Sequence, residues 1–135
     1  MPFFYTIDVL SRQHEECIEI TDQVAKQVKL SGVENGIAVV YVPHTTAGVA
    51  INEHADPSVM QDIRKMLGLL IPWDHEIYSH MEGNSAAHIK SVLTGSSVTV
   101  IVKDGKLVLG TWQGIFFCEF DGPRRRKVYV QIVRE

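Results

Sequence analysis

The chain contains stretches with strand-like hydrophobic patterns and others with helix-like patterns. The predicted strands are rich in aromatic and β-branched residues and are bounded by glycine, proline or aspartate. They alternate apolar and polar positions or form unbroken apolar runs, and they cover residues 3–10, 37–42, 98–102, 107–109, 114–120 and 127–133. Asp104 and Gly105 separate two of these runs and predict a tight hairpin turn.

Three further stretches have apolar residues at helical spacing next to capping or terminating residues. They run from Thr21 to Gly32, from Asp56 to Leu70, and from Asn84 or Ser85 to Leu93. Asp56 followed by Pro57 is typical of a helix start, because aspartate caps well and proline lacks only an N–H that would be unpaired anyway. Asn84 either lies inside its helix, sharing a face with His88, or caps it through its side chain.

The order of these elements favours an α+β fold. Strands and helices do not alternate strictly, so we expect β-sandwich-like, mixed or antiparallel sheets with about three helices. The sequence contains no internal repeat, low-complexity tract or linker. We therefore expect one domain over residues 1–135.

Composition narrows the class of protein. A net charge of −3 argues against a nucleic-acid binder held by a basic field. No apolar run approaches the roughly 20 residues of a membrane helix, and the start has no basic signal-peptide region. Cys17 and Cys118 lack metal-type spacing, so we expect two buried, reduced thiols in a cytoplasmic protein.

Six histidines are many for 135 residues, and the placement of three of them indicates chemistry. His44 follows the strand at 37–42, His80 precedes the third helix, and His88 lies in its first turn. Three neutral imidazoles suit zinc or a similar divalent metal with an open position for water or substrate. The alternative is three separate polar histidines, each satisfied by backbone or water. The remaining histidines are expected on the surface or in a loop: His14, His54 and His75.

Two pairs of polar or aromatic residues lie next to apolar stretches. Asn52 and Glu53 follow an apolar stretch, so Glu53 is either an acid/base group or metal ligand, or a plain surface carboxylate. Trp112 and Gln113 bring an aromatic face and an amide to a strand end. Burial of Trp112 in a core or subunit interface is the alternative to a binding role.

Arg124, Arg125 and Arg126, followed by Lys127, form the one basic run. Strand alternation would turn Arg124 and Arg126 to one face and Arg125 to the other. The shared face predicts a guanidinium fork for phosphate or carboxylate near the histidines. The alternative is a solvated edge strand protected by its charge.

Four blocks of residues occur in a characteristic order along the chain. They are His44-Thr45-Thr46-Ala47-Gly48 with Ile51-Asn52-Glu53, then Glu82-Gly83-Asn84-Ser85-Ala86-Ala87-His88-Ile89-Lys90 preceded by His80, then Leu109-Gly110-Thr111-Trp112-Gln113, and Asp121-Gly122-Pro123-Arg124. Together they resemble the secondary thiamine-phosphate synthase family of YjbQ-like proteins. The similarity extends from about Phe4 to Val133.

This resemblance implies a YjbQ-like α+β subunit that assembles as a homotrimer around polar clefts. The apolar run at 114–118, with both faces hydrophobic, predicts that apolar side chains of the strand-rich C-terminal half form the subunit interface. The implied site residues fall into three groups: catalytic Glu53, Asn52 and Asn84; cofactor- or substrate-binding Trp112, Gln113, Asp121, Arg124 and Arg126; and metal-binding His44, His80 and His88. His54 departs from the family pattern and is not counted.

The family name implies transfer of hydroxymethylpyrimidine from its diphosphate to a thiazole phosphate, with release of pyrophosphate. The expected partner is thus a small phosphorylated or anionic metabolite. A leaving diphosphate calls for magnesium or guanidinium groups, whereas imidazoles favour zinc. Two alternatives remain open: a metal-dependent hydrolase or lyase with a metal-activated water, and a non-catalytic trimer that binds a metal or metabolite.

Overall fold

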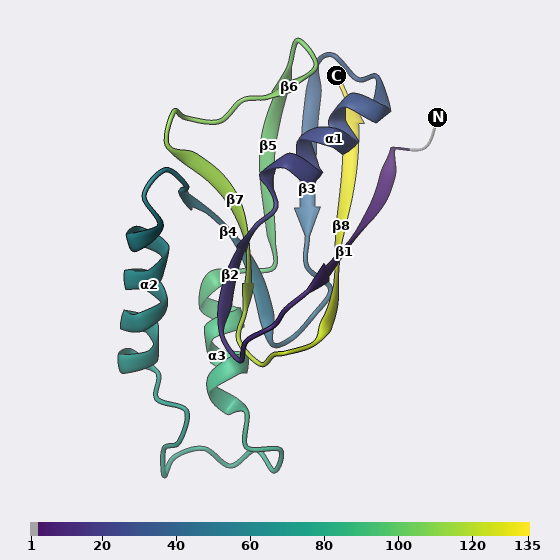
Figure 1. Cartoon of the computed structure of the whole chain (residues 1–135). Helices are drawn as coiled ribbons and strands as arrows, with labels where there is room; N and C mark the ends of the chain where they lie inside the picture. The colour runs from purple at the N-terminus through teal and green to yellow at the C-terminus, as the bar shows by residue number, and fades with distance from the viewer. Residues whose placement is uncertain (1–2) are drawn as a thin grey trace.

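Two antiparallel sheets and three helices make up residues 3–135, the part of the chain that the computed structural model describes (Figure 1). The elements in chain order are β1 (Phe4–Leu10), β2 (Glu16–Glu19), α1 (Thr21–Ser31), β3 (Gly36–Tyr41), β4 (Ala47–Glu53), α2 (Pro57–Leu70), α3 (Ser85–Thr94), β5 (Ser97–Lys103), β6 (Lys106–Leu107), β7 (Gln113–Glu119) and β8 (Arg125–Arg134).

The larger sheet has the strand order β1-β8-β3-β5-β6, and the smaller sheet has the order β2-β7-β4. Every strand pairing is antiparallel. Strand β8 lies between β1 and β3, so the last strand of the chain pairs with the first. The predicted α+β class with sandwich-like antiparallel sheets and three helices is confirmed.

The main core lies between the two sheets. Alternate residues of β3 and β8 face it, including Val40 and Val130, and β7 contributes Ile115 and Phe117 from the opposite side. Helix α1 adds Val24 to the same core. Burying each such side chain contributes roughly 1.5–3 kcal/mol, and this burial holds the sheets face to face.

A second, smaller core covers the other face of β7. Phe116, Cys118 and Phe120 pack there with Met60 of α2 and Ala87 of α3. Figure 1 shows α2 and α3 beyond the three-stranded sheet, on the side away from the termini. Both faces of β7 are therefore buried inside the chain. Residues 114–118, which motivated the predicted interface, are not available for one because the chain itself covers them. An interface elsewhere in the strand-rich C-terminal half stays a prediction.

The helix ends largely follow their sequence signals. Asp56 caps α2 by accepting a hydrogen bond from the Ser58 amide at 2.9 Å, with Pro57 at the first helical position. Gly32 ends α1 with a φ of 71°, a left-handed conformation that suits glycine. Thr21 is not the cap of α1. Its hydroxyl donates to Glu19 and accepts from the Ile115 amide, which joins α1 to β7.

The pattern of the chain did not predict β2 as a strand. Strand β2 has four residues and lies at the edge of its sheet beside β7, so too little alternation is present to recognise it. The predicted hairpin is present, and both turn residues, Asp104 and Gly105, have positive φ. Strand β6 is shorter than expected and ends at Leu107.

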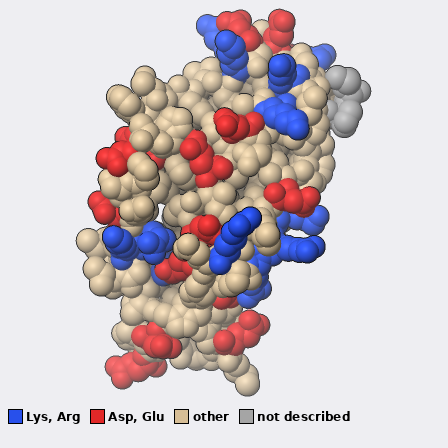
Figure 2. All heavy atoms as spheres, viewed as in Figure 1, with Lys and Arg blue, Asp and Glu red and all other residues tan. Residues whose placement is uncertain are grey.

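The outer surface of α2, α3 and their connection carries many apolar side chains. Exposed members include Met66, Leu69, Leu70, Ile77, Met81, Val92 and Leu93. Charges of both signs are spread over the face seen in Figure 2. Within residues 3–135, no helix has the length and apolar character that crossing a membrane requires.

Candidate functional site

Asp121, just after β7, joins three segments that are distant in sequence. One carboxylate oxygen, Oδ2, accepts from Asn84 Nδ2 and from Arg124 Nη2, each at 2.9 Å. The other, Oδ1, lies 3.5 Å from His14 Nε2. The start of α3, the β7–β8 turn and the loop before β2 thus meet at one carboxylate.

Asn84 occupies the N-cap position of α3, but its side chain makes no capping hydrogen bond. Its amide nitrogen instead reaches Asp121 and, at 3.4 Å, Glu82. Its Oδ1 atom is buried and has no hydrogen-bond partner among the described residues. An unsatisfied buried acceptor costs about 1–3 kcal/mol, so this oxygen is well placed for a donor group of a ligand.

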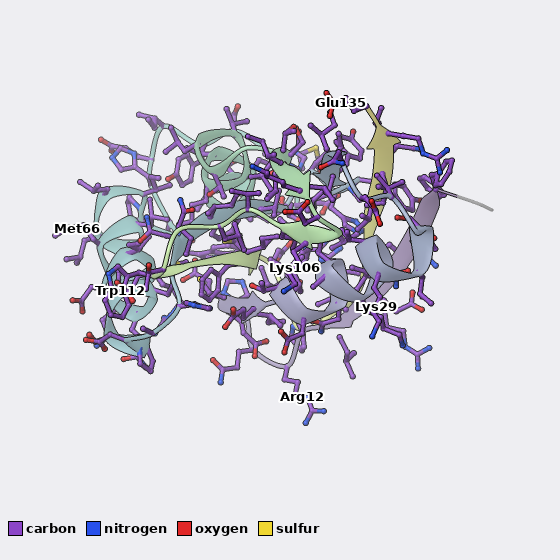
Figure 3. The ribbon with its side chains drawn as sticks, turned by 90° about the horizontal axis from the view of Figure 1, so that it is seen from above. Arg12, Lys29, Met66, Lys106, Trp112 and Glu135 are labelled. Atoms are coloured by element: carbon purple, nitrogen blue, oxygen red, sulfur yellow. The ribbon has the colours of Figure 1, made fainter. Side chains whose placement is uncertain are left out.

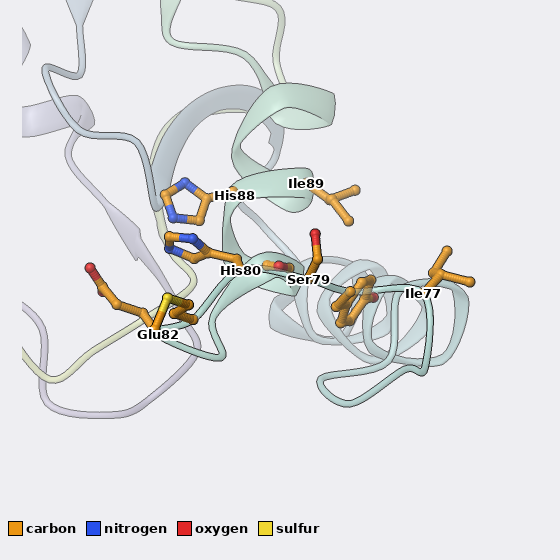
Figure 4. Close-up of a pocket in the computed structure, with 9 residues that line it drawn as sticks. Ile77, Ser79, His80, Glu82, His88 and Ile89 are labelled. Atoms are coloured by element: carbon orange, nitrogen blue, oxygen red, sulfur yellow. The ribbon is translucent and has the colours of Figure 1, made fainter.

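His80 and His88 form a pair beside this residue. Their ring centroids lie 5.3 Å apart with the planes at 87° (Figure 4). Glu82 and Ser85 line the same open pocket. Ile77 and Ile89 also line it and extend away from the imidazoles in Figure 4. The pocket therefore has a polar end at the histidines and an apolar end.

His44 is held differently. Its Nε2 atom accepts a hydrogen bond from the Lys127 backbone amide at 3.0 Å, so the ring proton must lie on Nδ1. Burial lowers the pKa of His44, and the nearby positive charge of Arg126 lowers it further. As folded here, His44 offers no free nitrogen lone pair to a metal.

The arrangement does not form a complete metal cage from side chains. Within residues 3–135, no three histidine, cysteine, aspartate or glutamate side chains are grouped as a metal ion requires. The structure pairs His80 with His88, while His44 is bound to Lys127. The metal site formed by all three histidines therefore stays a prediction.

Arg126 is committed to a buried ion pair with Glu119. Its Nε donates to Glu119 Oε2 at 2.8 Å and its Nη2 to Thr46 Oγ1 at 2.8 Å. Burial alone would raise the pKa of Glu119, but hydrogen bonds from Arg126, the Asp121 amide and Ser11 outweigh it and lower that pKa. Glu119 and Arg126 are 0% and 5% exposed, so this predicted binding arginine is occupied by the protein.

Arg124, unlike Arg126, has an exposed guanidinium. Its side chain is 50% exposed, and its Nε donates to the Asp121 carbonyl at 2.9 Å. These contacts orient the group without burying it. Arg125 is also exposed, but it lies at the start of β8, one position from the inward-facing Arg126, and so points to the opposite face.

Asn52, Glu53 and Gln113 lie at the opposite end of the small sheet. Strands β4 and β7 pair Ala47 with Glu119 at one end and Glu53 with Gln113 at the other. Six residue steps of a strand span about 20 Å. One chain therefore does not bring these residues to the histidines.

The side chains at this far end bond locally. Asn52 Oδ1 accepts from the Glu53 amide at 2.8 Å, and Glu53 Oε2 accepts from the Ala55 amide at 3.0 Å. Gln113 Oε1 accepts from the Gly110 amide at 2.8 Å. Trp112 is 62% exposed and lies at the periphery, on the same side as α2 (Figure 3).

Sequence reasoning missed some residues of the site. His14, expected as a plain surface residue, contacts Asp121 and packs edge-on against Trp73, with ring centroids 4.4 Å apart. Lys90 is buried and paired with Glu15, next to His14. One sequence feature could have indicated Lys90: it is a charged residue inside the otherwise apolar stretch of α3. His54 lies outside this group and contacts Glu19.

These features define the class of protein: an antiparallel α+β domain with a polar site where the start of α3 meets the β7–β8 turn. The chain belongs to the YjbQ family, since the family model described as "UPF0047 protein YjbQ-like" matches residues 5–135.

Relatives and solved structures agree with this assignment. A UPF0047 protein of Methanocaldococcus jannaschii is 55% identical, covering 96% of this chain and 93% of its own. YugU of Bacillus subtilis is 48% identical, covering 95% and 97%. A solved family member from Clostridium acetobutylicum has a TM-score of 0.94 at 52% identity, covering 96% of this chain and 99% of its own.

A more distant solved relative supports the same fold. A protein of unknown function from Sulfolobus solfataricus has a TM-score of 0.94 at 37% identity, covering 98% of this chain and 97% of its own. The descriptions of these four proteins name the family and no reaction. The family and fold are thus shown.

Proposed function

We propose that the site around Asn84, Asp121 and Arg124 binds a small phosphorylated metabolite and catalyses a group transfer of the thiamine-phosphate synthase type. Two features carry this proposal: Asn84 has a buried, unpartnered Oδ1, and the exposed Arg124 guanidinium shares the Asp121 carboxylate with the Asn84 amide. The particular reaction comes from the resemblance of the four sequence blocks. The site chemistry supports the broader substrate class.

The two groups select complementary parts of a substrate. Arg124 attracts a phosphate or diphosphate, and the positive end of the α3 dipole lies nearby at Asn84. Asn84 Oδ1 accepts only from a donor, such as an amino or hydroxyl group. A substrate with both an anionic group and a hydrogen-bond donor would satisfy both.

In the proposed transfer, the bond between the pyrimidine methylene carbon and the diphosphate oxygen breaks. A carbon–nitrogen bond to the thiazole ring forms, and pyrophosphate leaves. The protein must neutralise the charge that develops on the leaving group, which is the role we assign to Arg124. The Asp121 carboxylate holds that guanidinium in place from the other side.

Pyrophosphate is expected to bind the protein. Arg124→Gln is expected to weaken this binding about 10- to 100-fold, in line with a charge-assisted hydrogen bond of about 1.5–3 kcal/mol. Isothermal titration calorimetry measures both affinities. Arg125→Gln is the matched control, because Arg125 points to the other face of β8 and should leave the affinity unchanged.

The reaction itself is tested by incubating the protein with hydroxymethylpyrimidine diphosphate and thiazole phosphate. Formation of thiamine phosphate together with pyrophosphate supports the transfer. Pyrophosphate binding without turnover reduces the proposal to a metabolite-binding protein. Equal affinity in both arginine variants contradicts the site.

A second candidate function is a divalent-metal site at His80 and His88, favoured by their pairing and by Glu82 in the same pocket. No hydrogen bond within residues 3–135 occupies either ring, unlike that of His44. A bound metal would supply an activated water for a hydrolase or lyase reaction. Glu53, the predicted base, lies at the end of β4 opposite Ala47, about 20 Å along the small sheet of the same chain.

Purified protein is expected to contain a transition metal such as zinc. His88→Ala should reduce the metal content to background, because a site that loses one of its two histidine ligands seldom keeps the ion. Elemental analysis after gel filtration measures the metal content. His75→Ala is the control, since His75 is exposed and its Nδ1 accepts from the Ile77 amide. Equal metal content in both variants would exclude the pair as its site.

Homotrimer assembly remains a proposal from the resemblance. The exposed apolar side chains of α2, α3 and their connection form the candidate interface, rather than the buried run in β7. Such assembly could also place Asn52 and Glu53 of one subunit near the histidines of another. The two groups of motif residues would then share one cleft.

A further inference from the structure

The two cysteines, expected as buried, reduced thiols, lie directly opposite each other on β2 and β7. The Ile20 amide donates to the Ile115 carbonyl at 2.8 Å, which marks a hydrogen-bonded cross-strand pair. Antiparallel pairs alternate between hydrogen-bonded and non-hydrogen-bonded types. Cys17 and Cys118 lie three residue pairs away from Ile20 and Ile115 and therefore form a non-hydrogen-bonded pair.

The pairing of β7 with β4 leads to the same result. The Phe120 amide donates to the Thr46 carbonyl at 3.2 Å, so Cys118 directs its backbone groups toward β4 and not toward β2. Cα atoms in a non-hydrogen-bonded pair are about 4.5 Å apart, within the range of about 4.4–6.8 Å that disulfides span. The backbone therefore holds both thiols in bonding range.

Access to the two thiols is unequal. Both line a cavity of about 270 Å³ between the small sheet and α2, together with Met60 and Arg64. Cys17 also lines a neighbouring, more open pocket with Glu16 and Arg64. Cys118 is only 4% exposed. A reagent from solvent therefore reaches Cys17 first.

The electrostatics favour the same order. The hydrogen bond with Cys118 lowers the pKa of Cys17, and the positive charge of Arg64 lowers it further against the effect of burial. The same hydrogen bond, together with burial, raises the pKa of Cys118. Cys17 is the better nucleophile near neutral pH, because the thiolate is the reactive form.

We propose that Cys17 and Cys118 are a dithiol modification site that low-molecular-weight disulfides convert to an intrachain disulfide. The Cys17 thiolate attacks one sulfur of the small disulfide, forms a mixed disulfide and releases one thiolate. Cys118 then loses its proton, attacks the Cys17 sulfur and releases the second thiolate. In sum, two protein thiols are oxidised and one small disulfide is reduced to two thiols.

The bond would join the edge strand β2 covalently to β7. β2 follows directly after His14 and Glu15, whose side chains contact Asp121 and Lys90. Oxidation would therefore restrict the segment that brings His14 to the candidate site. The dithiol chemistry itself does not depend on the proposed function.

The test uses oxidised glutathione on the native, reduced protein. Wild type is expected to lose both titratable thiols and to carry no glutathione, with the Cys17–Cys118 peptide pair found by mass spectrometry. Cys118→Ala should retain one glutathione on Cys17, because no second thiol resolves the adduct. Cys17→Ala should react at least tenfold more slowly than wild type.

Several results would overturn the proposal. A stable glutathione adduct on wild type would show that Cys118 cannot reach Cys17, and a dimer linked through Cys17 would show that the partner thiol is on another chain. If a variant fails to fold, alkylation of the folded wild-type protein with iodoacetamide still shows which thiol reacts first. The proposal requires that Cys17 is labelled well before Cys118.

Discussion

Glu119→Ala is expected to destabilise the folded chain by about 3–5 kcal/mol, because it leaves a buried guanidinium without its carboxylate. Glu119 is fully buried and binds Arg126, Ser11 and the Asp121 amide. Removing it breaks these contacts together. Urea unfolding followed by circular dichroism measures the loss.

The matched control is Asp8→Ala. Asp8 pairs with Lys127 at 3.5 Å, but both side chains are largely exposed. Loss of such a surface pair costs about 0–1 kcal/mol. Similar losses in the two variants would contradict the structural role of the buried pair. Replacing Glu119 and Arg126 together by leucine and methionine should recover much of the stability, since no unpaired charge then remains.

Asn84→Asp is expected to lower pyrophosphate affinity and turnover about 100-fold, because like charges in contact cost several kcal/mol. The new carboxylate would lie where the Asn84 amide nitrogen is now 2.9 Å from Asp121 Oδ2. It would repel Asp121, displace Arg124 and oppose an anionic ligand. Calorimetry and the turnover assay measure the two losses.

Asn35→Asp is the control for adding one negative charge. Asn35 is exposed and its Oδ1 lies 3.5 Å from the Asp104 amide, at the hairpin turn between β5 and β6. Its affinity for pyrophosphate should match that of wild type. Thermal unfolding of both variants separates a loss of binding from a loss of fold. Wild-type binding by Asn84→Asp would refute the assigned site.

The larger sheet and the helices could be predicted well from sequence. Local sequence signals predicted them, such as the unbroken apolar run at 37–42 for β3 and Asp56 followed by Pro57 for the start of α2. The structure confirms both. The small sheet was harder to predict. Strand β2 is short, and β4 is buried at one end and exposed at the other, so neither shows regular alternation.

The candidate site was also predicted only in part. Two different motif blocks supplied Asn84, predicted as catalytic, and Asp121 and Arg124, predicted to bind substrate or cofactor, and the structure joins the three through the Asp121 carboxylate. Sequence could not show that Arg126 turns inward to Glu119, since a basic run looks the same whether paired or free. Nor could it show that β4 places Glu53 at the far end of the sheet, because distance along a strand depends on its pairing.

The position of β8 between β1 and β3 also affects how the protein folds. The pairing of Phe4 with Gln131 closes nearly the whole chain into one loop, and closing such a loop carries a large entropic cost. Until β8 emerges from the ribosome, β1 and β3 expose unpaired edges that other chains could join. The central sheet is therefore completed only after synthesis of β8, and we expect this long-range strand pairing to slow folding.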